Sequence, residues 1–547
     1  MNVARAVGQT LVRLGVEEFF GVIGSGNLVT TNAMVAAGAR FYNARHEGGA
    51  ITMADAYSRV TGRVGVCTVH HGPGLTNAMT GLTEAVKSRT PLLLLTSDVG
   101  ARALLSNFRI EQAQLVLAVG AVAAPLLTPE TAVADTLRAY RRALAERIPV
   151  VLMMPLDLQQ ADCPEPPTEL PPVVTLPPSL PAQPALKAAA SVLVGARRPL
   201  VIAGRGAVLA GAGDALQRLA EQIGALLATT AAAKDYFQNN RWSLGISGGF
   251  SSDLAAELIT QADVVLAVGA SLNMWTTRQG SLLSGQAKVI AIDSDARALG
   301  QHHRVDLALI GDARATVGGL AAELPDQASP GWRSDELAER IAAGTWLNQR
   351  YEDESTAERI DPRTLSLALG GLLPREVNIA TDGGHFCGNA ALYWTVPEPA
   401  AFVFTQNFQA VGIGLATGIG AGIGRPDRLT VTALGDGGAL MGISELETVA
   451  RLRLNMLIVV FNDAAFGAEV HHFQPLGEDL SLVRFEETDF VRLARAAGLD
   501  GVTVRRPDDL AQVKDWLAGS REKSLLVDAK VVPTVVAPWL EEAFKGH

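Results

Sequence analysis

Cysteine, aromatic residues and charge are all scarce in this chain of 547 residues. Only three cysteines occur, Cys67, Cys163 and Cys387, and their spacing matches no metal-binding motif. This pattern excludes a disulfide framework and is typical of a protein of the reducing cytoplasm. The amino-terminal residues also lack the apolar core of a signal peptide, so we expect a cytoplasmic location.

Charged residues make up 19% of the chain, and the net charge is −10. A negative balance argues against nucleic acid or an anionic membrane surface as the main partner. No uninterrupted apolar run is long enough to span a bilayer. Hydrophobic residues nevertheless reach 48%, so the chain can bury large cores and is not disordered. We therefore expect a globular protein with neither a nucleic-acid nor a membrane partner.

Glycine is abundant, with 54 residues, and short apolar runs alternate with alanine-rich helical patterns along the whole chain. This alternation predicts an α/β fold of mostly parallel sheets covered by helices. The runs that we interpret as strands are residues 64–69, 91–97, 199–203, 264–269, 288–293, 377–381, 429–434, 456–461 and 524–528.

Two segments divide the chain into three comparable parts. Residues 164–184 are rich in proline and predict an extended linker. Residues 326–361 are polar and predict a second linker, in which we expect residues 334–355 to be helical. The predicted domains are therefore residues 1–163, 185–325 and 362–547.

The most informative motif is Gly435-Asp436-Gly437, which follows the predicted strand at 429–434. After 24 intervening residues, Asn462-Asp463 follows the next predicted strand. Neighbouring parallel strands would present the two acids at their carboxyl ends, where open α/β sheets bind ligands. Glycines let the backbone approach a phosphate, and the carboxylates can hold a divalent cation against it.

This motif resembles the signature of enzymes that depend on thiamine diphosphate. In the first part, Arg45-His46-Glu47-Gly48-Gly49-Ala50 and Gly72-Pro73-Gly74 resemble segments of the acetolactate synthase branch of that family. The resemblance covers nearly the whole chain. It implies a pyrimidine-binding first domain, a Rossmann-like central domain and a diphosphate-binding third domain.

The resemblance implies that the third domain holds the diphosphate and Mg²⁺. The implied metal ligands are the side chains of Asp436 and Asp463 and the backbone carbonyl of Ala465; Asp463 stands where the family commonly has asparagine. Val411 would support the bent conformation of the cofactor, although plain apolar packing is the alternative. The remaining residues implied to bind the cofactor are Gly384, His385, Phe386, Gly412, Gly435, Gly437, Gly438 and Phe466.

Four residues are candidates for catalysis. The resemblance implies that Glu47 hydrogen-bonds the pyrimidine N1′ of the cofactor and so promotes loss of the proton from thiazolium C2; a capping charge at a helix start is the alternative. His70 resembles an active-site histidine of benzoylformate decarboxylase. We expect His70 and His71 to point in opposite directions, so that one at most faces the cofactor. Glu469 stands where simple 2-oxo acid decarboxylases carry a proton-donating acid, or it begins a polar helix.

The central part departs from the synthases. The segment at Gly204-Arg205-Gly206 does not match the dinucleotide-binding fingerprint. The FAD-associated segment of acetolactate synthases is replaced by Gly269-Ala270-Ser271, so we expect no FAD. Near residues 110–112, the Phe-Gln-Glu segment of the synthases is not clearly matched, which predicts a changed acceptor pocket.

These features predict decarboxylation of a 2-oxo acid with transfer of the acyl unit to a carbonyl acceptor. Simple decarboxylation to an aldehyde is the second reading, and cleavage of an acyloin or a 2-hydroxyacyl thioester the third. A non-catalytic member of the family is disfavoured because Glu47 and Asp436 are both present. In the family, the glutamate of one subunit meets the diphosphate domain of another, so we expect a homodimer or homotetramer.

Overall fold

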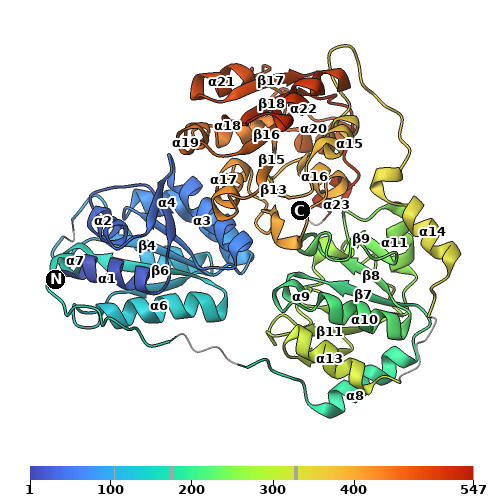
Figure 1. Cartoon of the computed structure of the whole chain (residues 1–547), viewed down its shortest axis with the longest axis horizontal. Helices are drawn as coiled ribbons and strands as arrows, with labels where there is room; N and C mark the ends of the chain where they lie inside the picture. Colours follow the sequence, from blue (N-terminus) through green and yellow to red (C-terminus); the bar gives the residue numbers. More distant parts are fainter. Residues whose placement is uncertain (104, 173–176, 326–330, 546–547) are drawn as a thin grey trace.

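The computed structural model describes residues 1–103, 105–172, 177–325 and 331–545. Across these residues, the strands form three six-stranded sheets flanked by helices (Figure 1). Neighbouring strands run parallel in each sheet. The predicted α/β class is therefore confirmed.

The first sheet has the strand order β2-β1-β3-β4-β6-β5. Its strands are β1 (Glu18–Gly21), β2 (Arg40–Asn43), β3 (Gly65–Val69), β4 (Leu92–Asp98), β5 (Val122–Pro125) and β6 (Pro149–Pro155). Its helices are α1 (Val3–Arg13), α2 (Leu28–Ala36), α3 (Glu47–Thr61), α4 (Pro73–Lys87), α5 (Gln112–Ala118), α6 (Ala132–Glu146) and α7 (Leu156–Gln160).

The central sheet has the order β12-β11-β10-β7-β8-β9. Its strands are β7 (Pro199–Ala203), β8 (Leu226–Thr229), β9 (Ser243–Ile246), β10 (Val264–Val268), β11 (Lys288–Asp293) and β12 (Leu307–Ile310). Its helices are α8 (Gln183–Val194), α9 (Arg205–Leu209), α10 (Gly213–Ile223), α11 (Asp253–Thr260), α12 (Met274–Thr277) and α13 (Ala313–Glu323), and α14 (Asp335–Ala343) follows in the linker.

The third sheet has the order β14-β13-β15-β16-β18-β17. Its strands are β13 (Val377–Thr381), β14 (Phe402–Phe404), β15 (Leu429–Gly435), β16 (Met456–Asn462), β17 (Asp500–Val504) and β18 (Leu525–Lys530). Its helices are α15 (Pro362–Leu372), α16 (Cys387–Tyr393), α17 (Gly414–Gly424), α18 (Asp436–Met441), α19 (Glu445–Leu452), α20 (Gly467–Phe473), α21 (Phe490–Ala497), α22 (Ala511–Ala518) and α23 (Leu540–Phe544).

The first and third sheets share one topology. Numbered within its own domain, each sheet reads second, first, third, fourth, sixth and fifth strand. Helices α3 and α17 therefore occupy corresponding places, each after the second strand of its domain. Helix α4 corresponds in the same way to α18 and α19, which follow the third strand.

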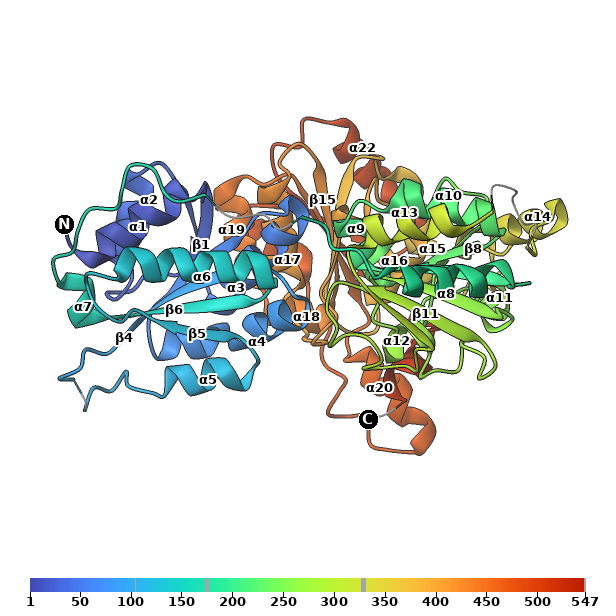
Figure 2. The same ribbon diagram turned by 90° about the horizontal axis from the view of Figure 1, so that it is seen from below.

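These corresponding helices join the two domains. Helix α3 packs against α17, and Figures 1 and 2 show the first domain beside the third. A Cβ atom on Gly420 of α17 would lie 2.2 Å from the carbonyl oxygen of Met53, so glycine is needed where the helices cross. A single apolar cluster runs from Ile51 through Leu415 to Val460 and is shared by both domains.

Most of the predicted strands are confirmed within one or two residues. The helix predicted over 334–355 is partly wrong: α14 ends at Ala343, Gly344 follows it, and only a short 3₁₀ turn, Trp346–Asn348, comes after. In the proline-rich segment, the described residues 164–172 and 177–182 form neither helix nor strand, and 173–176 lie outside the described residues. The predicted domain boundaries stay a prediction. No helix in the described part of the chain is long and apolar enough to cross a membrane.

Candidate functional site

The two acids of the glycine motif lie together at one edge of the third sheet. β15 ends at Gly435, and Asp436 begins α18. β16 pairs with β15 so that Gly435 stands opposite Phe461, two residues before Asp463. The side chain of Asp436 accepts hydrogen bonds from the backbone N–H groups of Gly437 and Ala464, each at 2.8 Å.

The electrostatics of this acid pair favour a bound cation. Burial raises the pKa of Asp436 above its usual range. Burial, together with the nearby charge of Asp436, raises the pKa of Asp463 as well. Two neighbouring buried carboxylates are stable as anions only beside positive charge. Ala464, with φ 57°, turns the chain between Asp463 and Ala465.

The ligands offered suit Mg²⁺. No cluster of three or more His, Cys, Asp or Glu side chains able to hold a metal occurs in the described residues, so the acid pair stands without a third such ligand. Mg²⁺ commonly takes one or two carboxylates and completes its octahedron with phosphate and water oxygens. The donor set therefore fits a magnesium ion that is shared with a phosphate group.

A glycine cradle lies beside the acid pair. A Cβ atom on Gly384 or on Gly435 would meet no atom within 4 Å, so both face open space. Gly384 has φ 102°, a conformation that side chains rarely adopt. Backbone exposed in this way can approach a diphosphate closely.

His385 adds a buried donor to this cradle. Its Nε2 accepts the backbone N–H of Ala537 at 3.0 Å, so Nδ1 carries the proton in the neutral ring. Burial, reinforced by His471, lowers the pKa of His385 to about 3. Nδ1 is buried and has no partner among the described residues. Both Nδ1 and the Asp463 carboxylate approach Gly467, so the histidine lies next to the acid pair at the start of α20.

Val411 stands between the two glycine loops. Cβ atoms on Gly383 and Gly438 would lie 3.1 and 3.2 Å from its methyl groups. Its side chain is 40% exposed, the opposite of what plain apolar packing within the chain requires. The next residues are held by Asp382, whose carboxylate accepts the N–H groups of Gly412, Ile413 and Gly414.

Phe386, predicted to bind the cofactor, is buried, and its ring stacks on that of Phe461 with centroids 5.1 Å apart, so it belongs to the core of the third domain. The other remaining predicted residue of this half is Phe466. It immediately precedes α20 and is 37% exposed. A Cβ atom on Gly437 would lie 2.5 Å from its ring, so glycine there lets the ring cover the loop. Glu469 follows on α20 and is half-buried.

Glu47 begins α3 in the first domain. The Nδ1 atom of His46 accepts the N–H of Gly48 at 3.0 Å and caps the helix. The Glu47 carboxylate accepts a hydrogen bond from the side-chain amide of Asn77 at 3.0 Å. Its other oxygen faces Gly74, where a Cβ atom would lie 3.4 Å away. These contacts hold the carboxylate but leave it partly exposed.

The expectation that His70 and His71 point in opposite directions is wrong. Their rings stack, with centroids 4.1 Å apart and planes 19° apart. β3 ends at Val69, so strand alternation does not govern the pair, and Gly72 turns the chain with φ 67°. His71 is buried, and burial and its neighbour His70 lower the pKa of His71 to about 4.

Sequence reasoning missed three residues around the histidines. The hydroxyl of Ser25 lies 3.2 Å from Nε2 of His70. The ring of Phe108 lies 5.0 Å from that of His70 and 5.2 Å from that of His71. Gln112 accepts the N–H of Gly72 and donates to the carbonyl of Ser97. The available signal was the segment at 108–112, which stands near the place of the family's Phe-Gln-Glu segment.

The two halves of the predicted site do not meet within one chain. Among the described residues, no hydrogen bond, ion pair or ring contact joins Glu47, His70 or His71 to the Asp436 loop or to Glu469. Each half is built by its own domain.

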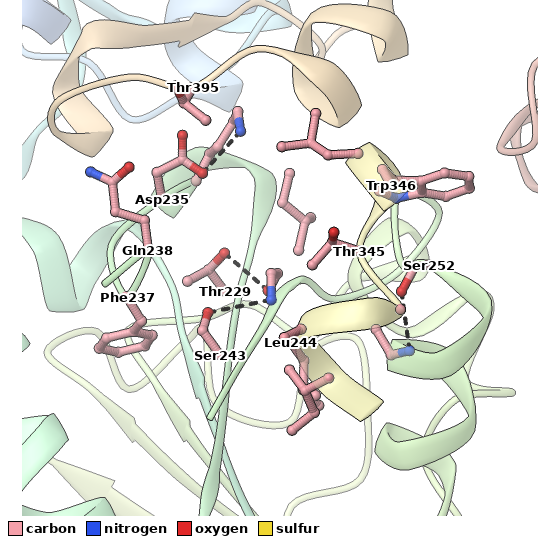
Figure 3. Close-up of a pocket in the computed structure, with 18 of the residues that line it drawn as sticks. Thr229, Asp235, Phe237, Gln238, Ser243, Leu244, Ser252, Thr345, Trp346 and Thr395 are labelled. Carbon is pink, nitrogen blue, oxygen red and sulfur yellow. Dashed lines mark hydrogen bonds and ion pairs between the residues drawn. The ribbon is translucent and has the colours of Figure 1, made fainter. Parts of the chain in front are cut away.

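Two cavities lie away from these residues. One, of about 640 Å³, lies between the central domain, the 3₁₀ turn at Trp346 and the end of α16; Asp235, Ser243 and Trp346 are among its lining residues (Figure 3). It contains none of the predicted site residues.

The second cavity, of about 330 Å³, lies at the carboxyl ends of β7 and β10, near Gly204 and Gly269 of the sequence segments considered for a nucleotide. Arg147 and Arg205 line it from two domains. Burial, and then the charges of Arg59 and Arg147, lower the pKa of Arg205 to about 9. The expected absence of FAD stays a prediction.

Comparison with known proteins agrees with the three-domain architecture. Three family models match: the N-terminal binding domain of thiamine pyrophosphate enzymes over residues 1–116, their central domain over 186–320 and their C-terminal binding domain over 382–529. The chain belongs to the thiamine pyrophosphate enzyme family. It is thus an enzyme that depends on thiamine diphosphate.

Three relatives show the range of activities among similar proteins. A probable 2-ketoarginine decarboxylase of Pseudomonas aeruginosa is 33% identical, with 94% of this chain and 91% of the relative covered. A sulfoacetaldehyde acetyltransferase of Alcaligenes xylosoxydans is 29% identical, with 93% and 89% covered. A probable acetolactate synthase large subunit of Methanocaldococcus jannaschii is 28% identical, with 98% and 93% covered.

Proposed function

We propose that this enzyme decarboxylates a 2-oxo acid and transfers the acyl unit to a carbonyl acceptor, with Mg²⁺ as its metal. The observation that carries the cofactor and metal assignment is the buried acid pair beside the open glycine cradle. The preference for transfer is supported by the segments around Glu47 and Gly72, which resemble those of acetolactate synthases. Relatives named as an acetyltransferase and an acetolactate synthase point the same way.

In this proposal, the third domain binds the cofactor. Asp436 and Asp463 hold Mg²⁺ by their side chains, and Ala465 contributes its carbonyl oxygen. Gly384, Gly435 and the Nδ1–H of His385 face the diphosphate. When bound, thiamine diphosphate supplies a carbon nucleophile and an electron sink for the bond that leaves with CO₂.

In the same proposal, the first domain supplies the groups that hold protons and hydrogen-bond the substrate. Glu47 holds a proton at the pyrimidine ring nitrogen, and Asn77 keeps its carboxylate in place. His71 is neutral at pH 7 because its pKa is lowered to about 4. The buried His71 ring packs against His70, and His70, the less buried of the two, can orient a substrate carbonyl or carboxylate together with the Ser25 hydroxyl by hydrogen bonds.

We also propose a dimer in which the first domain of one copy covers the third domain of the other. The apolar side chains around the Asp436 loop support this, because they are exposed in the single chain: Val411 is 40% exposed, Leu440 37% and Met441 59%. Exposed apolar side chains gathered at a cofactor loop are typical of a surface that another domain covers.

Simple decarboxylation is the second candidate. It is favoured by Glu469, half-buried on α20 just after the acid pair, where it can deliver a proton to the carbon that lost CO₂. The relative named as a decarboxylase supports the same reading.

A direct experiment separates the two. Purified protein loaded with thiamine diphosphate and Mg²⁺ is given a panel of 2-oxo acids with and without aldehyde or 2-oxo acid acceptors, and CO₂ and product mass are measured. We expect the coupled product to exceed free aldehyde when the acceptor is present. Aldehyde alone, with every acceptor, would reject transfer in favour of simple decarboxylation.

A further inference from the structure

Two buried glutamates each bind backbone N–H groups of the opposite domain at the boundary between the first and third domains. Glu84 lies on α4 of the first domain and is 1% exposed; Glu445 begins α19 of the third domain and is 2% exposed. These helices occupy corresponding places in the two sheets of equal strand order. We call Glu84 and Glu445 the glutamate pair.

Glu445 reaches the chain just before the Glu47 helix. One of its carboxylate oxygens accepts the backbone N–H groups of Arg45 at 3.0 Å and His46 at 3.1 Å. The same oxygen lies 2.5 Å from where a Cβ atom on Gly49 would stand, so glycine makes room for the carboxylate. The other oxygen accepts the hydroxyl of Thr448. Glu445 therefore holds, from outside its own domain, the segment that leads into α3 and Glu47.

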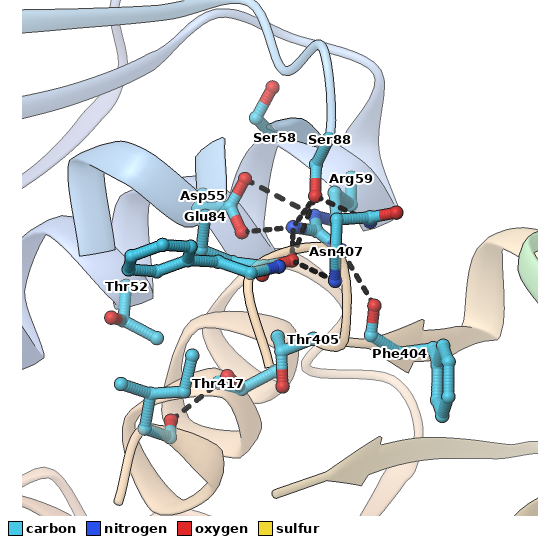
Figure 4. A network of polar contacts seen from close by, with 12 residues as sticks. Thr52, Asp55, Ser58, Arg59, Glu84, Ser88, Phe404, Thr405, Asn407 and Thr417 are labelled. Carbon is cyan, nitrogen blue, oxygen red and sulfur yellow. Dashed lines mark hydrogen bonds and ion pairs between the residues drawn. The ribbon is translucent and has the colours of Figure 1, made fainter. Parts of the chain in front are cut away.

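Glu84 makes the reciprocal contact with the segment before Val411. Its carboxylate accepts the backbone N–H of Phe408 at 2.7 Å and that of Asn407 at 3.4 Å (Figure 4). Arg59 of α3 donates to Glu84 at 2.9 Å and to the carbonyl of Phe404 at 3.0 Å. Asp55 supports Arg59 by an ion pair of 2.7 Å.

The Val411 segment is thus fixed at both ends. Glu84 holds Asn407 and Phe408 from the first domain, and Asp382 holds the N–H groups of residues 412–414 from the third. Between them, Gln409 adopts φ 61°, which a loop without such anchors would rarely keep.

We propose that Glu84 and Glu445 are positioning residues for the cofactor site: each glutamate, through backbone N–H groups of the opposite domain, holds the element that carries Val411 or Glu47. The inference rests on the proposed function, since it assigns the glutamate pair to the same site. Glu84 on α4 contacts the third domain, and Glu445 on the corresponding helix α19 contacts the first domain. Separation of the two domains would therefore release both halves of the site together.

The test measures backbone order and chemistry separately. In protein without cofactor, hydrogen–deuterium exchange is followed by mass spectrometry in Glu445→Ala, Glu84→Ala and wild type. We expect faster exchange over residues 45–50 in the first variant and over 405–412 in the second, by about 2- to 30-fold, as for the loss of a helix cap. The conservative variants Glu445→Gln and Glu84→Gln keep an oxygen acceptor and should restore most of the protection.

The control is Glu447→Gln. Glu447 lies on α19 at the same domain boundary, but it binds the side chain of Arg45 and is exposed. This variant should leave exchange unchanged in both segments.

The second readout uses protein loaded with thiamine diphosphate and Mg²⁺. The rate of cofactor C2 proton exchange should fall in Glu445→Ala, and cofactor affinity, measured by tryptophan fluorescence, should fall in Glu84→Ala. Faster hydrogen–deuterium exchange in the predicted segment, with unchanged C2 proton exchange and unchanged cofactor affinity, would overturn the inference. So would hydrogen–deuterium exchange at the wild-type rate in the alanine variants, or a uniform rise in exchange across the whole domain. If an alanine variant does not fold, Glu445→Asp or Glu84→Asp takes its place: the shorter side chain withdraws the carboxylate from the same N–H groups, so exchange should rise and the cofactor readout should fall in the same way, and wild-type behaviour of the aspartate variant would overturn the inference. Failure of the wild-type protein to bind the cofactor would instead reject the proposed function, while the exchange pattern would still report on the glutamate pair.

Discussion

At the scale of single residues, substitution of Glu47 should lower turnover without lowering the affinity for the cofactor. Glu47→Gln keeps an acceptor for the Asn77 amide but removes the acid, so we expect turnover to fall by about 10²- to 10⁴-fold, as for loss of a general acid–base group. Affinity for thiamine diphosphate should change little, because the residues proposed to bind the diphosphate lie in the third domain. Proton exchange at C2 of the bound cofactor, followed by NMR, measures the effect. Exchange at the wild-type rate in the variant would reject the role of Glu47.

His71 provides a prediction about pH. Its pKa in the folded protein is lowered to about 4 by burial and by His70, whereas an unfolded chain binds a proton at histidine near pH 6.5. The unfolded state therefore binds more protons between pH 6.5 and 4, and the free energy of unfolding falls as the pH drops through that window. Since one pKa unit corresponds to about 1.4 kcal/mol, we expect a loss of at most about 3 kcal/mol from this residue across the window.

NMR titration of the histidine ring signals checks this directly, with the His71 signal identified by its absence in His71→Gln. Titration of that signal near pH 6.5 would show that the ring is open to water. The pH dependence of stability in His71→Gln should also be shallower below pH 6.5 than in wild type.

Glu469 distinguishes the two candidate reactions. If its carboxyl delivers a proton after CO₂ leaves, Glu469→Gln should slow aldehyde release by about 10²- to 10⁴-fold while CO₂ release falls less. In a transferring enzyme, the ratio of coupled product to aldehyde should rise instead. The ratio from one 2-oxo acid with acceptor present, in wild type and variant, is the measurement. An unchanged ratio with unchanged rates would leave Glu469 without a catalytic role.

At the scale of elements, the start of α18 carries the metal half of the site. Asp436→Ala removes a carboxylate from the predicted metal site and leaves the N–H of Ala464 without its acceptor. We expect affinity for thiamine diphosphate, titrated in Mg²⁺, to fall at least about a hundredfold, equivalent to the loss of a buried charged ligand. Asp427→Ala, an exposed acid before β15, is the matched control. Retained binding in Asp436→Ala after chelator dialysis would contradict the metal site.

The sequence predicted this element well because its signals are local. An apolar run, a glycine turn and a following acid place Asp436 at the end of β15, and the next run does the same for Asp463. The short helix α18 had no such signal, because a few residues around a glycine are too short for a periodic pattern.

Contacts between distant parts of the chain could not be predicted in this way. Ser25 and Phe108 meet His70 from loops far apart in the sequence, and Glu445 meets residues 400 positions away. The histidine pair was predicted wrongly because strand alternation was extended past Val69, where the strand has already ended.

At the scale of the whole molecule, the proposed dimer depends on the apolar surface beside the Asp436 loop. Met441→Glu places a charge in that surface and should convert the dimer to monomers that lack activity. Val194→Glu, on an exposed position of the central domain, is the control and should stay a dimer. Sedimentation velocity measures the assembly. A monomeric wild-type protein with full activity would reject the shared site.

The shared contacts of the first and third domains also bear on how the chain is made. The amide groups just before α3 find their acceptor in Glu445, 400 residues later. At a synthesis rate of about 5–20 residues per second, this segment waits roughly 20–80 s on the ribosome before that acceptor exists. Helix α3 and its apolar face, which packs on α17, stay uncovered for the same interval. The nascent first domain therefore exposes the apolar face of α3 to chaperones until the third domain has been synthesised.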